Sequence, residues 1–290
     1  MTLGPRDGGR KARAMAAEGK RPGFPLRLPP SDGPSLKKNQ LPQASPAKPS
    51  VTAPALQARR PSSPPHYQPA GVGLDSQAVR SRMVDKLARQ GVSDAQVLLA
   101  MGSVERHRFV DTALANQAYE DTSLPIGLGQ TISKPNVVAR MLELLRQSPG
   151  MEASGKLGRV LEIGTGCGYQ AAVLSHLAVE VYSIERLRGL HDKARENLRH
   201  FRLPNVHLLF GDGMQGSAKG APYAAIIAAA GGEALPEAWI EQLAVGGRLV
   251  APMQTRTGQQ ALVVVDKTPQ GLQQSVLEPV HFVPLKSGTS

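Results

Sequence analysis

The sequence predicts an α/β fold in which helices cover both faces of a doubly wound, mostly parallel sheet of seven strands. After Gly158, short apolar runs alternate with helical stretches, which is typical of a parallel sheet buried on both faces. A glycine-rich turn joins the first of these runs to the helix that follows it. Two successive strands end the chain with only a Gly-containing connection between them, which predicts an antiparallel pair closing the sheet.

Composition divides the chain into two parts. Residues 1–75 carry 14 of the 24 prolines and 12 Lys and Arg against 4 Asp and Glu, so most of the formal net charge of +11 lies there. A segment with so little apolar surface cannot offset the backbone entropy of folding, about 1 to 2 kcal/mol for each ordered residue. We therefore expect a disordered, basic, Pro-rich tail over residues 1–75 and one folded domain over residues 76–290.

The composition also bounds location and partners. The first 20 residues are charged and Gly-rich, without the apolar run of a secretory signal, and no stretch reaches the roughly 18 apolar residues of a membrane span. The lone Cys167 can form no internal disulfide, which fits a reducing compartment. The basic tail lacks the interleaved aromatic residues of a single-strand nucleic-acid surface. We expect a cytoplasmic monomer with no membrane attachment and no specific nucleic-acid partner.

Helical patterns begin the folded part. Apolar residues repeat at four over residues 79–87, which predicts a helix that ends at Gly91. Ser93 and Asp94 then open a second helix. Residues 124–133 are rich in turns, and Pro135 lies in the first turn of a third, apolar-striped helix.

The remaining elements follow from the alternation of apolar runs and helical spacing. Strands are expected over residues 159–163, 180–184, 206–210, 224–229 and 248–251, with the final pair over 261–265 and 276–283. Helices are expected over residues 169–177, 187–201 and 235–243.

The turn after the first strand contains Gly164, Gly166 and Gly168 at a spacing of two. Glycines there let the backbone approach a ligand closely, with helix N–H groups facing it. A dinucleotide fingerprint would need a small residue at position 169, where this chain has Tyr169. The spacing therefore counts against NAD.

Three acidic residues accompany three successive strand ends. Glu162 precedes the first glycine, Glu185 ends the next strand, where it can accept both hydroxyls of a ribose, and Asp212 follows the strand after that. This arrangement resembles the binding site for S-adenosylmethionine in class I methyltransferases. That resemblance places Glu162 at the methionine end of the cofactor and Asp212 at the adenine edge. Each acid has a simpler interpretation as a helix cap or a solvated loop residue.

Other reactive residue types carry less information. Cys167 has no motif that places a base beside it, so it is interpreted as a small residue of the glycine turn. His107, His176, His191 and His200 lack the spacing of metal ligands, and we expect no metal site.

From about Gln77 to Leu285 the chain resembles the protein-L-isoaspartate O-methyltransferases. The most specific element is Leu-Pro-Ile-Gly-Leu-Gly-Gln-Thr-Ile-Ser at residues 124–133, a segment that class I methyltransferases in general lack. Residues 160–169, Gly-Asp-Gly at 211–213 and His-Phe-Val-Pro-Leu at 281–285 also resemble that family.

The resemblance implies a Rossmann-like methyltransferase fold, S-adenosyl-L-methionine as cofactor, and methylation of the free α-carboxylate of isoaspartyl residues in damaged proteins and peptides. It implies Ser133 as the catalytic residue. The residues that it implies for cofactor binding are Gln130, Thr131, Ile132, Glu162, Gly164, Thr165, Gly166, Gly168, Glu185, Arg186, Gly211, Asp212 and Gly213.

The chain departs from the family pattern at Lys134, Asn136, Met214 and residues 228–233, where a loop that usually contains proline is expected. Two alternatives stay open: a class I methyltransferase acting on RNA or a small molecule, and a non-catalytic binding protein. The first does not explain residues 130–133 and lacks an Asn-Pro-Pro-Tyr-like motif after the strand at 224. The second does not require Ser133.

Overall fold

Seven strands form the main sheet of the computed structural model, which describes residues 77–149, 151 and 155–290. The expected tail over residues 1–75 lies outside the described residues. The strands are β3 (Leu157–Ile163), β4 (Ala178–Glu185), β5 (Val206–Phe210), β6 (Tyr223–Ala228), β7 (Leu243–Gln254), β8 (Gln260–Thr268) and β9 (Gly271–Val280).

The order of the strands across this sheet is β5-β4-β3-β6-β7-β8-β9. The first five strands of this order are parallel, and β8 and β9 add to them in antiparallel fashion. The predicted doubly wound sheet with an antiparallel end is thereby confirmed. Because the chain leaves β3 toward β4 on one side and later returns to β6 on the other, a crevice forms at the carboxyl ends of these strands.

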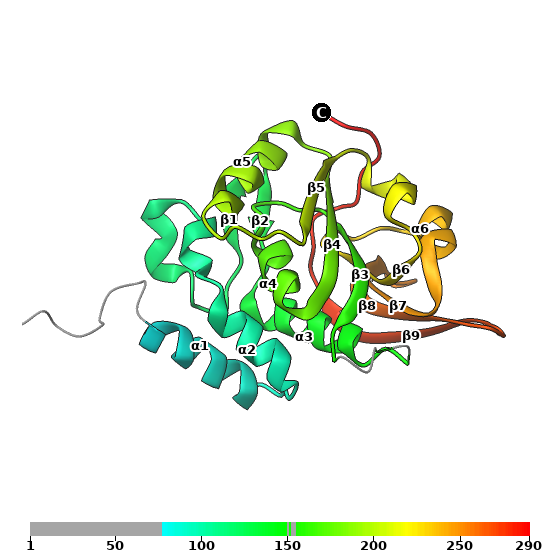
Figure 1. Cartoon of the computed structure of the whole chain (residues 1–290), viewed down its shortest axis with the longest axis horizontal. Helices are drawn as coiled ribbons and strands as arrows, with labels where there is room; N and C mark the ends of the chain where they lie inside the picture. The colour runs from blue at the N-terminus through cyan, green and yellow to red at the C-terminus, as the bar shows by residue number, and fades with distance from the viewer. Residues whose placement is uncertain (1–76, 150, 152–154) are drawn as a thin grey trace, which may run out of the picture. The chain divides into compact units, whose positions relative to one another are not determined.

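Helices cover both faces of the sheet. The helices α1 (Gln77–Arg89), α2 (Ala95–Ser103), α3 (Pro135–Arg146), α4 (Tyr169–Leu177) and α5 (Arg188–Arg199) contribute to one apolar cluster, and α6 (Glu237–Gln242) packs through Trp239 into a second. In Figure 1, α1 to α5 gather on one side of the central strands and α6 lies on the other. The short 3-10 helices are η1 (Arg106–Phe109), η2 (Thr112–Gln117), η3 (Gly213–Gln215) and η4 (Ala218–Gly220).

Strand β3 shows how the apolar pattern builds this core. Val160 joins the cluster under the first five helices, whereas Leu161 and Ile163 join the cluster under α6. Successive side chains point to opposite faces of a strand, so a nearly continuous apolar run buries both. This is the physical reason why the sequence predicted a sheet covered on two sides.

The predicted helix ends at the start of the domain are confirmed. Gly91 has a φ of +103°, and Val92 N–H donates to Leu87 O at 3.2 Å, which closes α1 in a Schellman arrangement. Asp94 caps α2 by accepting from the backbone N–H groups of Gln96 and Val97 at 2.8 and 3.1 Å.

Most boundaries differ from the predictions, by up to five residues, and three of the differences have a clear physical reason. Residues 124–133 contain a hairpin of β1 (Leu124–Gly127) and β2 (Gln130–Ile132), because the two short segments pair across the turn at Leu128 and Gly129. The last strand is β9, which starts and ends earlier than residues 276–283, since residues 283–285 leave the edge to hydrogen-bond with Gly231. The helix expected over residues 235–243 begins only after Pro236 and ends before β7.

Candidate active site

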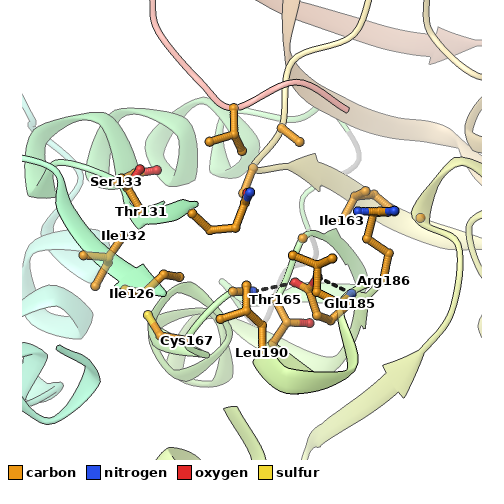
Figure 2. Close-up of a pocket in the computed structure, with 18 of the residues that line it drawn as sticks. Ile126, Thr131, Ile132, Ser133, Ile163, Thr165, Cys167, Glu185, Arg186 and Leu190 are labelled. Atoms are coloured by element: carbon orange, nitrogen blue, oxygen red, sulfur yellow. Dashed lines mark hydrogen bonds between the residues drawn. The ribbon is translucent and has the colours of Figure 1, made fainter. Parts of the chain in front are cut away.

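A cavity of about 470 Å³ lies at the carboxyl ends of β3, β4 and β6, within the size range of small-molecule sites. Residues from the glycine turn, the β1–β2 hairpin, the loop after β6 and the C-terminal segment line it. In Figure 2, Ser133 and Glu185 lie on opposite sides of this cavity. The predicted residues that line it are Gln130, Thr131, Ile132, Ser133, Gly164, Thr165, Gly166, Glu185, Arg186 and Gly213.

The glycine turn brings main chain to the wall of the cavity. Gly166 has a φ of +58°, and its N–H donates to the Glu185 carboxylate at 2.9 Å. A Cβ added at Gly166 would lie 3.2 Å from the Ile126 side chain of the hairpin. Position 166 therefore needs both the left-handed conformation and the small volume of glycine.

Glu185 fixes the turn from the neighbouring strand. One of its carboxylate oxygens accepts from Gly166 N–H and the other accepts from Leu187 N–H at 2.9 Å. The side chain lines the cavity although it is only 5% exposed. Each carboxylate oxygen has a further lone pair, so Glu185 can still accept hydrogen bonds from hydroxyl groups in the cavity.

Glu162 lies behind the wall of the cavity and not on it. Its carboxyl group is fully buried, accepts from Gln170 Nε2 at 3.0 Å and accepts a short hydrogen bond from Ser183 Oγ. The Ser183 hydroxyl also pairs with Thr165 Oγ1 at 2.6 Å. Burial raises the pKa of Glu162 to about 8, against the hydrogen bonds from Ser183 and Gln170 that lower it. This buried network supports the glycine turn from below.

The C-terminal segment passes the carboxyl end of β5, which Asp212 follows. Asp212 accepts from Met214 N–H at 2.9 Å through one oxygen and from Gly288 N–H at 2.7 Å through the other. Arg186 Nε donates to Gly288 O at 2.9 Å, and Ser290 exchanges backbone hydrogen bonds with Arg186 and Arg188. The segment therefore links the loop after β4 to the loop after β5, and Lys286 lines the cavity. Gly168, Gly211 and Asp212, which were predicted to bind cofactor, lie beside the cavity without lining it.

Ser133 follows β2 directly and precedes α3. Apolar side chains of Ile126, Ile132 and Val138 line the cavity around it. Within the described part of the chain, the Ser133 hydroxyl has no hydrogen-bond partner, while its backbone carbonyl accepts from Arg106 Nη2 at 2.7 Å. The hydroxyl is therefore available to a group that enters the cavity.

The other reactive residues have structural surroundings. Cys167 is 3% exposed, and burial raises the pKa of its thiol to about 11, so the thiol stays protonated at neutral pH. His107 Nδ1 pairs with Tyr119 Oη at 2.7 Å, and His191 packs edge-on against Phe210. Across residues 77–149, 151 and 155–290, no three His, Cys, Asp or Glu side chains form a group that could hold a metal ion. None of the described helices is long and apolar enough to span a membrane.

A second hollow of about 850 Å³ adjoins the first. It shares Pro284 and Leu285 with the first cavity and is otherwise lined by residues 214, 231–234, 254, 258–260 and 279–281. The stretch at 228–233 that departs from the family pattern contributes to both, through Ala229 and Ala230 in the first cavity and residues 231–233 in the second hollow. Gly231 and Gly232 pair with residues 283–285 and 252–254 through backbone hydrogen bonds.

Some lining residues were not predicted from the sequence. Gln170 stands in the first turn of α4, two residues beyond Gly168, and this position was a usable signal because helix N-termini face ligands bound at such turns. Leu128, at the tip of the hairpin, and Lys286, near the C-terminus, gave no signal. Their contribution depends on contacts with segments remote in the chain.

The donors and acceptors of this cavity fit S-adenosylmethionine. The glycine turn presents backbone at one wall, Glu185 presents a carboxylate to ribose hydroxyls, and Ile163, Ile184 and Gly213 line an apolar part suited to a purine. Fold and site together define a class I methyltransferase that uses S-adenosylmethionine. The model of the family described as protein-L-isoaspartate(D-aspartate) O-methyltransferase matches residues 78–290. The chain belongs to this family.

Individual relatives agree with this assignment. A protein-L-isoaspartate O-methyltransferase of Methylibium petroleiphilum is 56% identical over 276 residues, covering 92% of this chain and 97% of its own. One from Leptothrix cholodnii is 64% identical over 223 residues, covering 76% and 78%. A solved protein-L-isoaspartate O-methyltransferase has a TM-score of 0.64 at 28% identity, covering 72% of this chain and 66% of that chain.

A solved structure from Plasmodium falciparum, described as a protein-L-isoaspartate O-methyltransferase in complex with S-adenosyl-L-homocysteine, has a TM-score of 0.60 at 24% identity. The match covers 71% of this chain and 98% of that chain, and it bears on the fold.

Proposed function

We propose that this protein transfers a methyl group from S-adenosylmethionine to the free α-carboxylate of L-isoaspartyl residues in damaged proteins and peptides. Membership of the family supports this reaction. The observation in the structure that carries it is the placement of Ser133, whose hydroxyl has no partner among the described residues and stands across the cavity from Glu185, among apolar side chains.

The cofactor-binding residues divide between the strand ends. The backbone of the glycine turn and Gln170 would hold the methionine end of the cofactor, while Glu185 would accept the ribose hydroxyls. Gly213 and Ile184 would border the adenine ring, and Asp212 would lie near its edge. Glu162 contributes from behind by holding Gln170 and Ser183 in place.

The acceptor needs no general base from the protein. A carboxyl group with an ordinary pKa near 3.9 is ionised at neutral pH and is itself the nucleophile. When bound, the cofactor supplies an electrophilic methyl group on its sulfonium. The protein's task is to hold the carboxylate in line at about 3 to 3.5 Å and to remove water from it.

Ser133 performs the positioning. Its hydroxyl donates one hydrogen bond to one carboxylate oxygen, which leaves the other oxygen to attack. The side chains of Ile126, Ile132 and Val138 exclude water from the same region because they offer it no hydrogen bonds. Ser133 therefore acts as a catalytic residue by orientation and takes no proton.

The rest of the peptide lies toward the second hollow. This hollow meets the first cavity at Pro284 and Leu285 and is bordered by the glycines at 231 and 232. Polar side chains such as Gln254 and Gln260 also line it and can form hydrogen bonds with peptide main chain, which suits an enzyme that accepts many sequences. The departure of residues 228–233 from the family pattern therefore acts on the affinity for the peptide.

The test is transfer of labelled methyl from S-adenosylmethionine to two peptides that differ only in one isoaspartyl or normal aspartyl linkage. We expect a base-labile ester on the isoaspartyl peptide alone. Equal labelling of both peptides would show that the enzyme does not distinguish the isoaspartyl from the normal aspartyl linkage. No labelling of either, by protein that binds S-adenosylhomocysteine, would reject the proposal and make RNA and small molecules the next acceptors to try.

We further propose that the methyltransferase domain spans residues 76–290 and acts as a cytoplasmic monomer. The start of the family match at residue 78 supports this boundary. The single buried Cys167 suits a reducing compartment. Light scattering on the purified protein measures its oligomeric state directly.

A further inference from the structure

Arg106, in η1, is a fully buried cation beside Ser133. Its side chain has no exposed surface. Nη2 donates to the Ser133 carbonyl at 2.7 Å, and Nε donates to the Ala118 carbonyl at 2.7 Å. One guanidinium thus holds two backbone segments that are 15 residues apart, one of which leads into the active-site serine.

The same guanidinium lies over the aromatic ring of Tyr169, with its central carbon 4.7 Å from the ring centroid. Tyr169 is the first residue of α4, directly after Gly168, and it lines the cavity. Arg106 therefore contacts the serine side of the site, which receives the acceptor, and the glycine-turn side, which receives the methyl donor.

Filling of space alone accounts poorly for a cation at this position. In the part of the chain that the structure describes, Arg106 forms no ion pair, and its Nη1 has no hydrogen-bond partner. Burial lowers the pKa of Arg106, which Tyr169 and Cys167 oppose most and Asp121 opposes from beyond ion-pair distance. An apolar side chain of similar size would fill the same space without the cost of burying an uncompensated charge, but it would leave the Ser133 and Ala118 carbonyls without this donor.

We propose that Arg106 is a positioning residue for methyl transfer, which sets the placement of Ser133 relative to the glycine turn. This inference rests on the function proposed for Ser133. A flexible side chain such as methionine would fill the volume but would leave the Ser133 carbonyl free to move. Because in-line transfer depends on the distance between nucleophile and methyl group, a shift of about 1 Å can lower the rate about 100-fold.

The experiment is a double-mutant cycle of Arg106→Met and Ser133→Ala, with kcat/KM for an isoaspartyl peptide and Kd for S-adenosylhomocysteine measured for all four proteins. We expect Arg106→Met alone to lower kcat/KM about 30- to 100-fold, mostly through kcat, while Kd changes less than about 3-fold. In the Ser133→Ala background the same substitution should change kcat/KM less than about 3-fold, because Arg106 acts through the serine.

Arg248→Met is the matched control. Arg248 is also largely buried, donates to Asp266 at 2.7 and 2.8 Å, and holds the Leu144 carbonyl at 2.9 Å, away from the cavity. Its loss should lower the melting temperature without changing kcat/KM at temperatures well below the transition. If Arg106→Met does not fold, the cycle is run with Arg106→Lys, which keeps the charge and part of the hydrogen bonding.

The outcomes separate this inference from the proposed function. Equal effects of the Arg106 substitution with and without the Ser133 hydroxyl would overturn the inference, as would a parallel loss of S-adenosylhomocysteine binding. An unaltered kcat/KM in Ser133→Ala would reject the function proposed for Ser133 and, with it, this inference. Methylation of the isoaspartyl peptide by the unmodified protein would still stand in that case.

Discussion

At the scale of single residues, the site separates the groups that face the cavity from those that hold them. Ser133 and Glu185 face the cavity, whereas Glu162 and Arg106 are buried behind it. Hydrogen bonds join the two layers, through Gln170 to Glu162 and through the Ser133 carbonyl to Arg106. Substitutions in the two layers should therefore change different measured quantities.

Ser133→Ala should lower kcat/KM for an isoaspartyl peptide by about 10- to 100-fold, because it removes one hydrogen bond to a charged group, worth about 1.5 to 3 kcal/mol. The Kd for S-adenosylhomocysteine, measured by calorimetry, should change less than about 2-fold. A comparable loss of kcat/KM and of S-adenosylhomocysteine affinity would mean that Ser133 belongs to the cofactor site.

Gly166→Val should abolish binding of S-adenosylhomocysteine, because the new side chain meets Ile126 and forces a residue with a φ of +58° into strain of about 1 to 2 kcal/mol. Gly91→Val is the control, since Gly91 also has a positive φ but has open space around it and lies at the end of α1. Both variants should lose stability in urea unfolding, Gly166→Val by more because of the contact with Ile126, and only Gly166→Val should lose the ligand. If Gly166→Val still binds S-adenosylhomocysteine, the cofactor does not approach the backbone of residue 166 closely.

Glu162→Gln should change how stability depends on pH. Burial raises the pKa of Glu162 from its ordinary value of 4.5 to about 8, so between these values the folded protein keeps a proton that the unfolded chain releases. The stabilisation from this proton is complete below pH 4.5 and is lost as the pH rises to about 8. Urea unfolding without cofactor should show the variant gaining on the unmodified protein by up to about 1.4 kcal/mol per pH unit in this window. Parallel curves would mean that Glu162 ionises normally in the folded state.

At the scale of elements, two segments outside the main sheet close the site. The β1–β2 hairpin places Ile126, Leu128 and Ser133 along one wall, and Lys193 of α5 holds it by donating to Ile126 O at 2.9 Å. The segment over residues 284–290 places Leu285 and Lys286 along another. Neither wall belongs to the parallel strands that carry the glycine turn.

Deletion of residues 287–290 should speed dissociation of S-adenosylhomocysteine about 3- to 10-fold. It removes the hydrogen bonds that the backbone of Gly288 and Ser290 forms with Asp212, Arg186 and Arg188, each worth about 1 kcal/mol in net stability. Thr289→Ala keeps that backbone and should leave the rate unchanged. Stopped-flow displacement measures both, and slower dissociation after the deletion would show that the segment competes with the cofactor.

At the scale of the whole molecule, composition separates a basic stretch over residues 1–75 from a nearly neutral domain. Deletion of residues 1–75 should leave kcat/KM and melting temperature nearly unchanged, because these residues contain too little apolar surface to add to a core. The melting temperature of the full chain and of residues 76–290 can be compared by calorimetry. A fall of several degrees on deletion would mean that the basic stretch packs against the domain.

The pattern of the sequence was sufficient for the seven strands of the sheet, although the bounds of all but β5 differ from the prediction by up to five residues. Apolar runs whose side chains point alternately to the two faces of a sheet, and glycine-rich turns at strand ends, are local signals in the sequence. Strand β5 and helix α4 have the predicted bounds. The β1–β2 hairpin was harder to predict from the sequence, because its strands of four and three residues are too short for an alternation of apolar and polar residues to be recognised.

By itself the sequence determined the doubly wound fold, the glycine turn, the carboxylates at three strand ends and the resemblance that singles out Ser133. These depend on the order of residue types along the chain. Only the tertiary structure decided that Glu162 lies behind Gln170, that Gly288 reaches Asp212 and that Arg106 holds Ser133. The physical reason is that the last two contacts join residues 76 and 27 positions apart, and the first depends on burial, so each is settled by packing of separate elements.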